Sequence, residues 1–186
     1  MTRWLAFALS MAAVLIPALW PQAAQPDTSA VHTGQMFPQL SGQTLTGKSV
    51  ELPAATMGKP AVMIVSFSKT AGKDARSWNE RLSRDFPKEV PSYTLILLES
   101  VPKLFRGLAV SSIKSSMPIP TQDRTVVLYS DEKLWKQRVA FSEDSRAYVI
   151  LLGPDGRIRW TNKAAFSQPS YAEMKDLLDR LLRPHS

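Results

Sequence analysis

The residues best suited to chemistry stand directly after an apolar segment. Residues 63–78 read MIVSFSKTAGKDARSW, which predicts a buried strand, a tight turn at Gly72 and then a helix. Lys73 and Asp74 follow that glycine. Asp74 could act as a general base or a ligand, or it could favour the positive end of the helix dipole. Lys73 could bind an anion at the same helix end, or be an ordinary exposed lysine.

Cysteine and histidine chemistry is nearly absent from the chain. It has 0 cysteines, which excludes disulfides, thiol catalysis, iron–sulfur clusters and cysteine-based zinc sites. Its 2 histidines, His32 and His185, stand near the two ends, which disfavours a histidine metal site or a Ser/His/Asp triad. The sequence GKDARS lacks the context of a phosphate-binding loop. We therefore expect no metal and no cofactor.

The composition indicates a basic globular domain. Lys plus Arg number 23 and Asp plus Glu 16, giving a net charge of +7 over 186 residues. A basic surface can attract nucleic acid, anionic lipid or acidic protein, or can simply be solvated. No basic block interleaved with aromatic residues is present, so nucleic-acid binding is disfavoured. Hydrophobic residues form 44% of the chain, enough for a core, and 14 prolines disfavour an all-helical architecture.

A basic and apolar segment, VPKLFRGLAVSSIK, is a candidate contact surface. Leu104, Phe105 and Leu108 stand at helical spacing among basic residues. Such a piece could contact an anionic membrane surface or a partner helix, or it could pack over the edge of a sheet. Gly107 within it and Pro118 after it argue against a long regular helix.

A second candidate surface contains Arg157, Arg159 and Trp160. These residues could form a cation–π or docking patch for a partner. Strict alternation along a strand would instead place Ile158 and Trp160 on the core face and both arginines in solvent.

The hydrophobic pattern predicts the elements that position these residues. Residues 33–52 predict a hairpin around Gly47, residues 60–67 a strand buried on both faces, and residues 73–86 an amphipathic helix. The later expected elements are strands at 92–100, 125–130 and 147–152, an irregular or helical insert after the first of them, a short helix after the second, and a turn at 153–156 followed by an alternating strand. This order predicts an α/β sandwich with a mixed central sheet flanked by helices.

The last helix has the clearest pattern. Ser170 and Glu173 have the spacing of a capping box, and Pro184 ends the helix. Its apolar stripe consists of Met174, Leu177, Leu178, Leu181 and Leu182.

The first 24 residues predict a sorting segment. One charge, Arg3, precedes an uncharged apolar run over residues 4–20 and small residues after it. A cleaved signal peptide and a retained membrane anchor both fit this pattern. Residues 25–32 are expected to form a linker and residues 33–184 one domain. We expect an exported protein, periplasmic or anchored to the inner membrane and facing the periplasm.

Several segments resemble the thioredoxin-like fold of exported thiol-disulfide and peroxiredoxin-like proteins. They are IVSFSKTAGKDARSW, YVILLGPDGRIRW and, as an N-terminal hairpin extension, GQMFPQLSGQTLTGKSVELP. In that family a Cys-x-x-Cys turn begins a helix, because the helix dipole lowers the pKa of the thiol. The resemblance places Ala71 and Asp74 at the cysteine positions, Gly72 and Lys73 between them, and the family's cis-proline at residues 146–147. It therefore implies the scaffold without its redox groups.

A narrower resemblance covers residues 92–160 and continues into the last helix. ESVPKLFRGLAVSSIKSSMPIPTQDR and YSDEKLWKQRVAFSEDSRAYVILLGPDGRIRW resemble the thioredoxin-like assembly factors for the membrane sector of ATP synthase. The signature is the YVILLGPDGRIRW hairpin together with IPTQDR. Ser145 departs from it, since an Asn-type residue is expected there. The resemblance implies an assembly role and the absence of the redox pair.

Together these observations favour a non-catalytic exported domain that binds a membrane protein complex, with ATP synthase as the implied complex. The expected partner contacts are Leu104, Phe105, Leu108, Arg157, Arg159 and Trp160. An enzyme stays open as an alternative: a hydrolase or isomerase that uses Lys73 and Asp74, or a partner-dependent redox component. A domain that merely spaces a complex at the membrane also stays open, and an exposed apolar patch would distinguish a binding protein from it.

Overall fold

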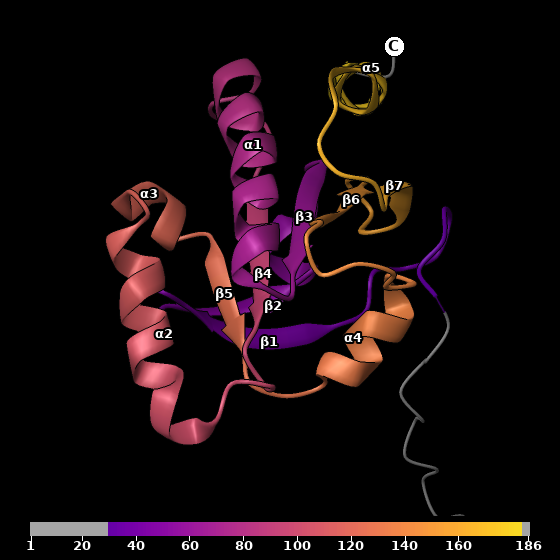
Figure 1. Cartoon of the computed structure of the whole chain (residues 1–186). Coiled ribbons are helices and arrows are strands. Elements are labelled where there is room, and N and C mark those ends of the chain that lie inside the picture. The colour runs from indigo at the N-terminus through magenta and orange to yellow at the C-terminus, as the bar shows by residue number, and fades with distance from the viewer. Residues whose placement is uncertain (1–29, 184–186) are drawn as a thin grey trace, which may run out of the picture.

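The computed structural model describes residues 30–183. The predicted signal peptide or anchor lies outside the described residues, as does most of the predicted linker. Over residues 30–183 the chain forms one mixed sheet of seven strands with helices on both faces (Figure 1). The strand order is β2-β1-β5-β4-β3-β6-β7. The predicted α/β sandwich with a mixed central sheet is confirmed.

The elements follow one another in nearly the predicted order. The strands are β1 (Leu40–Thr44), β2 (Ser49–Leu52), β3 (Ala61–Ser66), β4 (Ser92–Leu97), β5 (Thr125–Leu128), β6 (Tyr148–Leu152) and β7 (Ile158–Asn162). The helices are α1 (Lys69–Asp85), α2 (Lys103–Ser115), α3 (Ile119–Gln122), α4 (Glu132–Arg138) and α5 (Gln168–Leu182), with a 3-10 turn η1 at Ala54–Thr56.

Strand β3 lies in the interior of the sheet, between β4 and β6, and all six of its residues are buried. It pairs in parallel with β4 and antiparallel with β6, and β4 pairs in parallel with β5. Met63 and Val65 face one hydrophobic core, and Val62 and Ile64 face the other. The continuous apolar run therefore arises because helices cover both faces of the strand.

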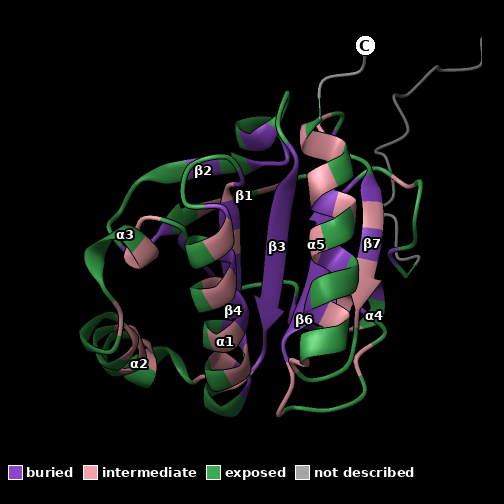
Figure 2. Ribbon diagram, turned by 90° about the horizontal axis from the view of Figure 1, so that it is seen from above, coloured by how far each residue is buried: buried purple, intermediate pink, exposed green. Residues whose placement is uncertain are grey.

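Helices α1 and α5 cover one face of the sheet. Figure 2 shows both helices in front of the buried strands, with exposed and intermediate residues along their outer side. Trp78 of α1 occupies the centre of this layer, with its ring centroid 6.1 Å from that of Trp160 and 5.2 Å from that of Phe166. The apolar stripe predicted for the last helix meets this core through buried Met174 and Leu178.

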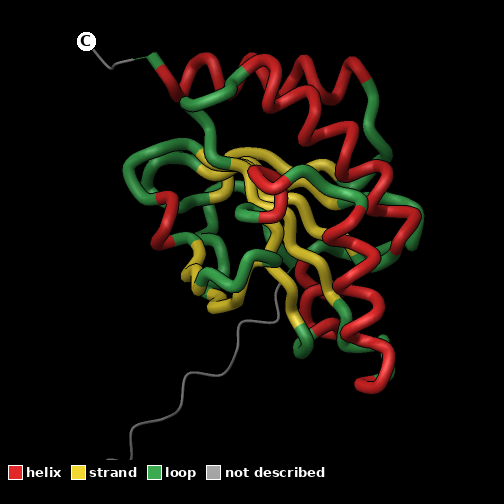
Figure 3. The backbone as a smooth tube through the Cα atoms, turned by 90° about the vertical axis from the view of Figure 1, so that its left-hand side faces the viewer, coloured by secondary structure: helices red, strands yellow, loops and turns green. Residues whose placement is uncertain are grey.

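The opposite face is covered by α4 and by the segment before β1. Figure 3 shows the strands as one twisted layer between helical segments. Trp135 packs against Phe37 with a centroid distance of 5.8 Å. Val31 is buried in the same core, and its N–H donates to the carbonyl of Arg138 at 2.7 Å. The folded part thus includes Val31, which lies inside the predicted linker.

The N-terminal hairpin is present and lies at one edge of the sheet. Strands β1 and β2 pair antiparallel, and Gly47 in their turn has a φ of 89°, a left-handed value that favours glycine. Strand β1 also pairs antiparallel with β5. The hairpin therefore extends the sheet beyond its parallel strands.

The end of the sheet corrects one prediction about β7. Trp160 pairs with Leu151 and Ile158 pairs with Leu152, so Arg159 is an extra residue in a β-bulge. Ile158 and Trp160 are both buried, but Ile158 lies in the core under α4 and Trp160 in the core under α1 and α5. The prediction that alternation puts both on one face is wrong, because the bulge shifts the pleat by one residue.

Two predicted helix starts are also wrong. Helix α1 begins at Lys69, capped by Ser68, so the expected turn at Gly72 is helical. Helix α5 is capped by Ser167, whose Oγ accepts from the N–H of Ser170 at 3.2 Å, so Ser170 and Glu173 do not form the capping box. In both places a serine just upstream of the expected start provides the cap.

Helix α2 is more regular than its sequence predicts. It runs for 13 residues straight through Gly107, and Pro118 lies beyond its end. A glycine within a helix costs only about 1 kcal/mol relative to alanine, which packing of the opposite face offsets. The prediction that Gly107 prevents a regular helix is therefore wrong.

Gly42 and Gly107 differ in whether the structure has room for a side chain. A Cβ at Gly42 would lie 2.5 Å from Cγ1 of Val126, which is fully buried and β-branched, whereas a Cβ at Gly107 would meet nothing within 4 Å. We predict that Gly42→Ala lowers the free energy of unfolding by about 1–3 kcal/mol. The matched Gly107→Ala should raise it by up to about 1 kcal/mol. Urea unfolding followed by circular dichroism measures both, and equal effects would contradict this packing.

Candidate functional site

The expected catalytic turn forms the first two turns of α1. The resemblance put Ala71 and Asp74 where cysteines begin the helix, but the helix N-terminus lies at Ser68. Ala71 is fully buried and Gly72 is partly buried. Lys73 is exposed and is the fifth residue of the helix, a full turn past the end that could bind an anion. The expectation that Lys73 and Asp74 lie at the positive helix end is therefore wrong.

Ser68 joins the start of α1 to the loop before β6. Its Oγ accepts from the N–H of Ala71 at 3.0 Å and donates to the carbonyl of Asp144 at 2.5 Å. One hydroxyl thus caps the helix and holds the loop against it. The sequence contained a signal for this cap, since a serine directly follows an apolar strand and precedes a polar helix.

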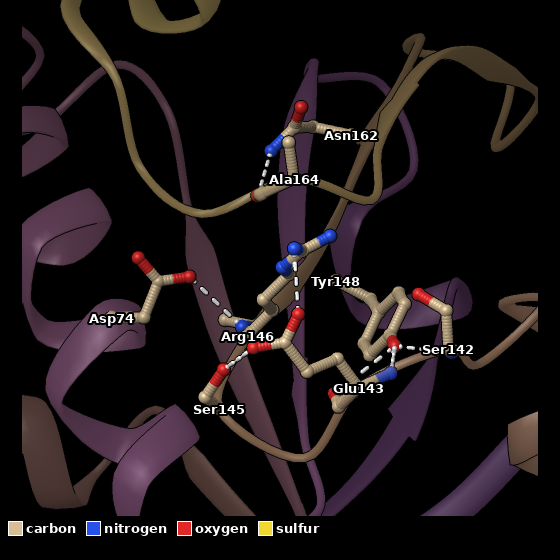
Figure 4. A network of polar contacts seen from close by, with 9 residues as sticks. Asp74, Ser142, Glu143, Ser145, Arg146, Tyr148, Asn162 and Ala164 are labelled. Atoms are coloured by element: carbon tan, nitrogen blue, oxygen red, sulfur yellow. Dashed lines mark hydrogen bonds and ion pairs between the residues drawn. The ribbon is translucent and has the colours of Figure 1, made fainter.

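Asp74 joins α1 to two other parts of the chain. Its Oδ2 accepts from the N–H of Ala147 at 2.9 Å, and its Oδ1 accepts from the N–H of Phe166 at 2.7 Å. Figure 4 shows the side chain pointing from α1 toward the strand that begins at Tyr148. Both oxygens serve backbone donors, so the arrangement makes Asp74 a bridge between elements.

The loop between α4 and β6 is held by a polar network (Figure 4). The hydroxyl of Tyr148 accepts from the N–H of Ser142 at 2.8 Å and of Glu143 at 3.1 Å. The carboxylate of Glu143 pairs with Arg146 at 2.6 Å and accepts from Ser145. The resemblance places the family's cis-proline at the end of this loop. Here side-chain contacts fix the loop instead.

Neither a metal-binding cluster nor a membrane-spanning helix occurs among residues 30–183. Among residues 30–183, no three His, Cys, Asp or Glu side chains gather closely enough to hold a metal ion. Within the same part of the chain, no helix combines the length and the apolar character needed to cross a bilayer.

Two glutamates connect the loops that leave the parallel strands β4 and β5. The N–H of Ser100 donates to Oε2 of Glu132 at 3.0 Å, and the N–H of Glu132 donates to Oε2 of Glu99 at 2.6 Å. Lys136 also reaches Glu132, at 2.8 Å. Burial raises the pKa of the Glu132 carboxyl, but the hydrogen bonds from Lys136 and Ser100 outweigh burial and hold that pKa below its ordinary range. No local sequence pattern predicts the contact between Glu99 and Glu132, because the two residues are far apart in the chain.

Helix α2 packs through one face and leaves the predicted contact residues on the other. Val110 and Ile113 pack against the small core formed by β4 and β5. Leu104, Phe105 and Leu108 are 84%, 54% and 70% exposed. Val110 and Ile113, rather than the predicted contact residues, therefore pack α2 against the sheet. Leu104, Phe105 and Leu108 form the exposed apolar patch that a binding protein needs.

Arg106 fixes α2 to the loop that precedes it. Its guanidinium donates to the carbonyls of Val101 at 3.0 Å and Glu99 at 3.1 Å. It also lies over the ring of Tyr129, 5.2 Å from the centroid. Arg106 thus anchors the part of α2 that carries exposed Leu104 and Leu108 to the preceding loop and to Tyr129.

The second predicted surface is not a free patch. Trp160 is buried, so its assignment as a surface contact is wrong. Arg159 pairs with Asp155 at 2.7 Å, and Arg157 donates to the carbonyl of Gly34 at 2.9 Å. Both arginines retain exposed surface, but these contacts hold them to the β6–β7 turn and to the segment before β1.

A groove that the sequence did not predict separates α1 from α2 and α3. Its volume is about 620 Å³, and Thr94 and Ile96 of β4 lie among its lining residues. The amide of Asn79 donates to Oγ1 of Thr94 at 2.9 Å, and Arg76 reaches the carbonyl of Ser116 at 3.2 Å. The residues that line the groove belong to several separate helices and strands, so no sequence motif marks it.

The Asp74 bridge predicts a stability effect. Asp74→Ala leaves two inward backbone N–H groups without an acceptor, so we expect the free energy of unfolding to fall by about 2–4 kcal/mol. Asp74→Asn keeps one acceptor oxygen, so its free energy of unfolding should lie between those of Asp74→Ala and the wild type. Asp176→Ala, at an exposed position of α5, is the control and should change stability by less than about 0.5 kcal/mol. Urea unfolding measures all three, and an unchanged midpoint for Asp74→Ala would contradict the bridge.

The Glu132 contacts predict a dependence of stability on pH. Because its folded-state pKa is lowered, its contribution is present above the ordinary carboxyl pKa and is lost as pH falls through the folded pKa. We therefore expect the difference in unfolding free energy between wild type and Glu132→Gln to be largest at neutral pH. It should shrink steadily in urea titrations at decreasing pH. A difference that grows on acidification would show that the sign is wrong.

Solved structures with a similar backbone establish the fold. The thioredoxin domain of a thiol-disulfide oxidoreductase from Bacteroides vulgatus has a TM-score of 0.59 and 18% identity, covering 80% of this chain and 99% of its own. A thioredoxin-family thiol:disulfide interchange protein from Chlorobium tepidum has a TM-score of 0.53 and 13% identity, covering 83% and 100%. At these identities the likeness shows the fold, which is thioredoxin-like.

A third structure belongs to an assembly protein. BsSco, a member of the Sco family of cytochrome c oxidase assembly proteins, has a TM-score of 0.57 and 13% identity, covering 82% of this chain and 96% of its own. No curated protein sequence matches the chain. The family model described as ATP10 protein matches residues 29–181, which include nearly all of the described fold. The chain therefore belongs to the ATP10 protein family.

Proposed function

We propose that this chain is a non-catalytic assembly factor for the membrane sector of ATP synthase. Membership in the ATP10 family carries this proposal, since the match extends over residues 29–181. The likeness to BsSco adds that the same fold occurs in a family of assembly proteins for another membrane complex. The partner is then a subunit or intermediate of the ATP synthase membrane sector.

The absence of catalysis is supported by what occupies the start of α1. A thiol at this place would use the helix N-terminus to lower its pKa, but the chain has 0 cysteines and Ser68 uses that end as a cap. Asp74, the candidate general base, has both oxygens engaged by backbone N–H groups. A general base needs a free lone pair directed at a substrate, and these contacts leave Asp74 poorly placed to provide one.

The setting at a membrane is supported by the sequence before the described fold. The uncharged apolar run over residues 4–20, preceded by Arg3, fits a signal or an anchor. We propose that the domain is exported and works at the periplasmic side of the inner membrane. The exposed leucines and phenylalanine of α2 favour a domain that makes a contact over one that only spaces a complex.

Deletion of the coding gene tests the assembly role. We expect assembled ATP synthase, measured on native gels of detergent-solubilised membranes, to fall at least about fivefold while its individual subunits are still made. The wild-type chain should restore it, and mild-detergent purification should recover membrane-sector subunits. An unchanged level of the assembled enzyme would contradict the proposal.

Lys73→Ala tests the absence of catalysis in the same strain. Lys73 is exposed, so the variant should fold normally and restore assembly as fully as wild type. A variant that accumulates normally but fails to restore assembly would instead support the enzyme alternative.

A further inference from the structure

The exposed apolar residues of the described chain are concentrated on α2 and α3. Leu104, Leu108 and Ile119 are 84%, 70% and 70% exposed, and Phe105 is 54% exposed. Leu104 and Leu108 stand one turn apart and point away from the core contacts of Val110 and Ile113. Figures 1 and 2 show α2 at the side of the molecule, with its first turn at an outer corner. Nothing else in residues 30–183 covers this face.

The charges around this face are positive. Residues 100–122 contain Lys103, Arg106 and Lys114 and no Asp or Glu. Lys103 and Lys114 are exposed. They stand 11 residues apart, which is about three helical turns, so both lie on the same side of α2, next to Leu104 and Leu108. Of the acidic residues that border the segment, Glu99 accepts from Glu132 and Asp123 pairs with Lys48 at 2.8 Å.

The start of α2 adds to this positive character. Its N-cap is Pro102, which offers no side-chain acceptor, and the first turn contains no acidic residue. The partial positive charge of a helix N-terminus therefore stands beside Lys103, and the first turn of the helix contains no carboxylate. Phosphate groups are the anions best matched to such an end together with a lysine.

We propose that the first part of α2 docks on an anionic phospholipid surface, with Leu104, Phe105 and Leu108 in the headgroup layer and Lys103 and Lys114 beside lipid phosphates. This inference deepens the proposed function and rests on it for the presence of a membrane. It assigns a lipid contact that the assembly role by itself does not require.

The extent of the apolar surface favours lipid over a partner helix. A helix bound in a protein groove offers anchors at i, i+3 or i+4, and i+7. After Leu108 the outward positions of α2 are Ser111, Ser112 and Ser115, so the apolar contact ends after about two turns. A short apolar tip with lysines on its flank matches the shallow insertion of interfacial helices.

A single-site probe tests the docking surface. Because the chain has 0 cysteines, Ser111→Cys gives one thiol on the outward face of α2 and leaves the leucines intact. The whole chain, labelled there with an environment-sensitive fluorophore, is reconstituted into vesicles of phosphatidylcholine alone or with phosphatidylglycerol. We expect emission to rise about twofold or more, with shielding from iodide, only when phosphatidylglycerol is present. A probe at Glu173→Cys, exposed on α5, should not respond.

Charge reversal provides matched variants in the labelled chain. Lys103→Glu with Lys114→Glu should abolish the phosphatidylglycerol-dependent signal, whereas Lys59→Glu with Lys88→Glu changes the net charge equally at exposed sites elsewhere and should retain it. Leu104→Ser with Leu108→Ser should reduce the signal at least about fivefold while circular dichroism shows an unchanged fold.

Several results would overturn the inference. They are an equal response in phosphatidylcholine alone, no response with phosphatidylglycerol, equal loss in the two charge-reversal pairs, or shielding that appears only when ATP synthase subunits are added. Failure here is distinguishable from failure of the assembly role. A chain that restores ATP synthase but gives no lipid signal overturns only this inference. A chain that binds anionic vesicles through α2 but is dispensable for assembly overturns only the proposed function.

Discussion

The carboxylate of Asp74 holds together parts of the chain on which the rest of the fold depends. Its two oxygens accept from Ala147 and Phe166, which are 73 and 92 residues away in sequence. Hydrogen bonds from backbone donors to a charged acceptor are among the stronger ones in proteins. They set α1 against the beginning of β6 and against the segment that leads into α5. The layer of α1 and α5, with Trp78 between them and the sheet, is built on that alignment.

The same alignment explains how a thioredoxin-like scaffold can persist without thiols. In redox proteins of this shape the helix N-terminus stabilises a thiolate, which needs access to a partner. Here the hydroxyl of Ser68 takes that end of α1 and joins it to Asp144. Tyr148 and Glu143 then hold the neighbouring loop. The side chains of Ser68 and Asp74 at this junction connect α1 to the loop before β6 and to the segment before α5.

Much of the fold could be predicted because buried positions hold apolar residues at regular spacing in the sequence. The apolar runs of β3 and β6 and the stripe of α5 each reflect a fixed surface that must be covered. The sequence predictions are wrong where a single residue decides where a helix begins or which face of the sheet a strand residue occupies. Ser68 begins α1 earlier than its apolar period indicates, and the bulge at Arg159 turns Trp160 to the other face. The Asp74 bridge joins residues through tertiary packing, which no local pattern encodes.

Helices α1 and α2 differ in how much of their apolar surface is buried in the fold. Ala71 and Trp78 of α1 are fully buried, so their transfer from water stabilises the fold. Leu104 keeps 84% of its surface in water, so it contributes little to folding. Burial of a leucine is worth roughly 1.5–3 kcal/mol, and that free energy stays available for contact with another surface. Because Arg106 already fixes the backbone beneath it, little ordering entropy would oppose the contact. A rigid helix with unused apolar surface is therefore the part of this fold best suited to binding.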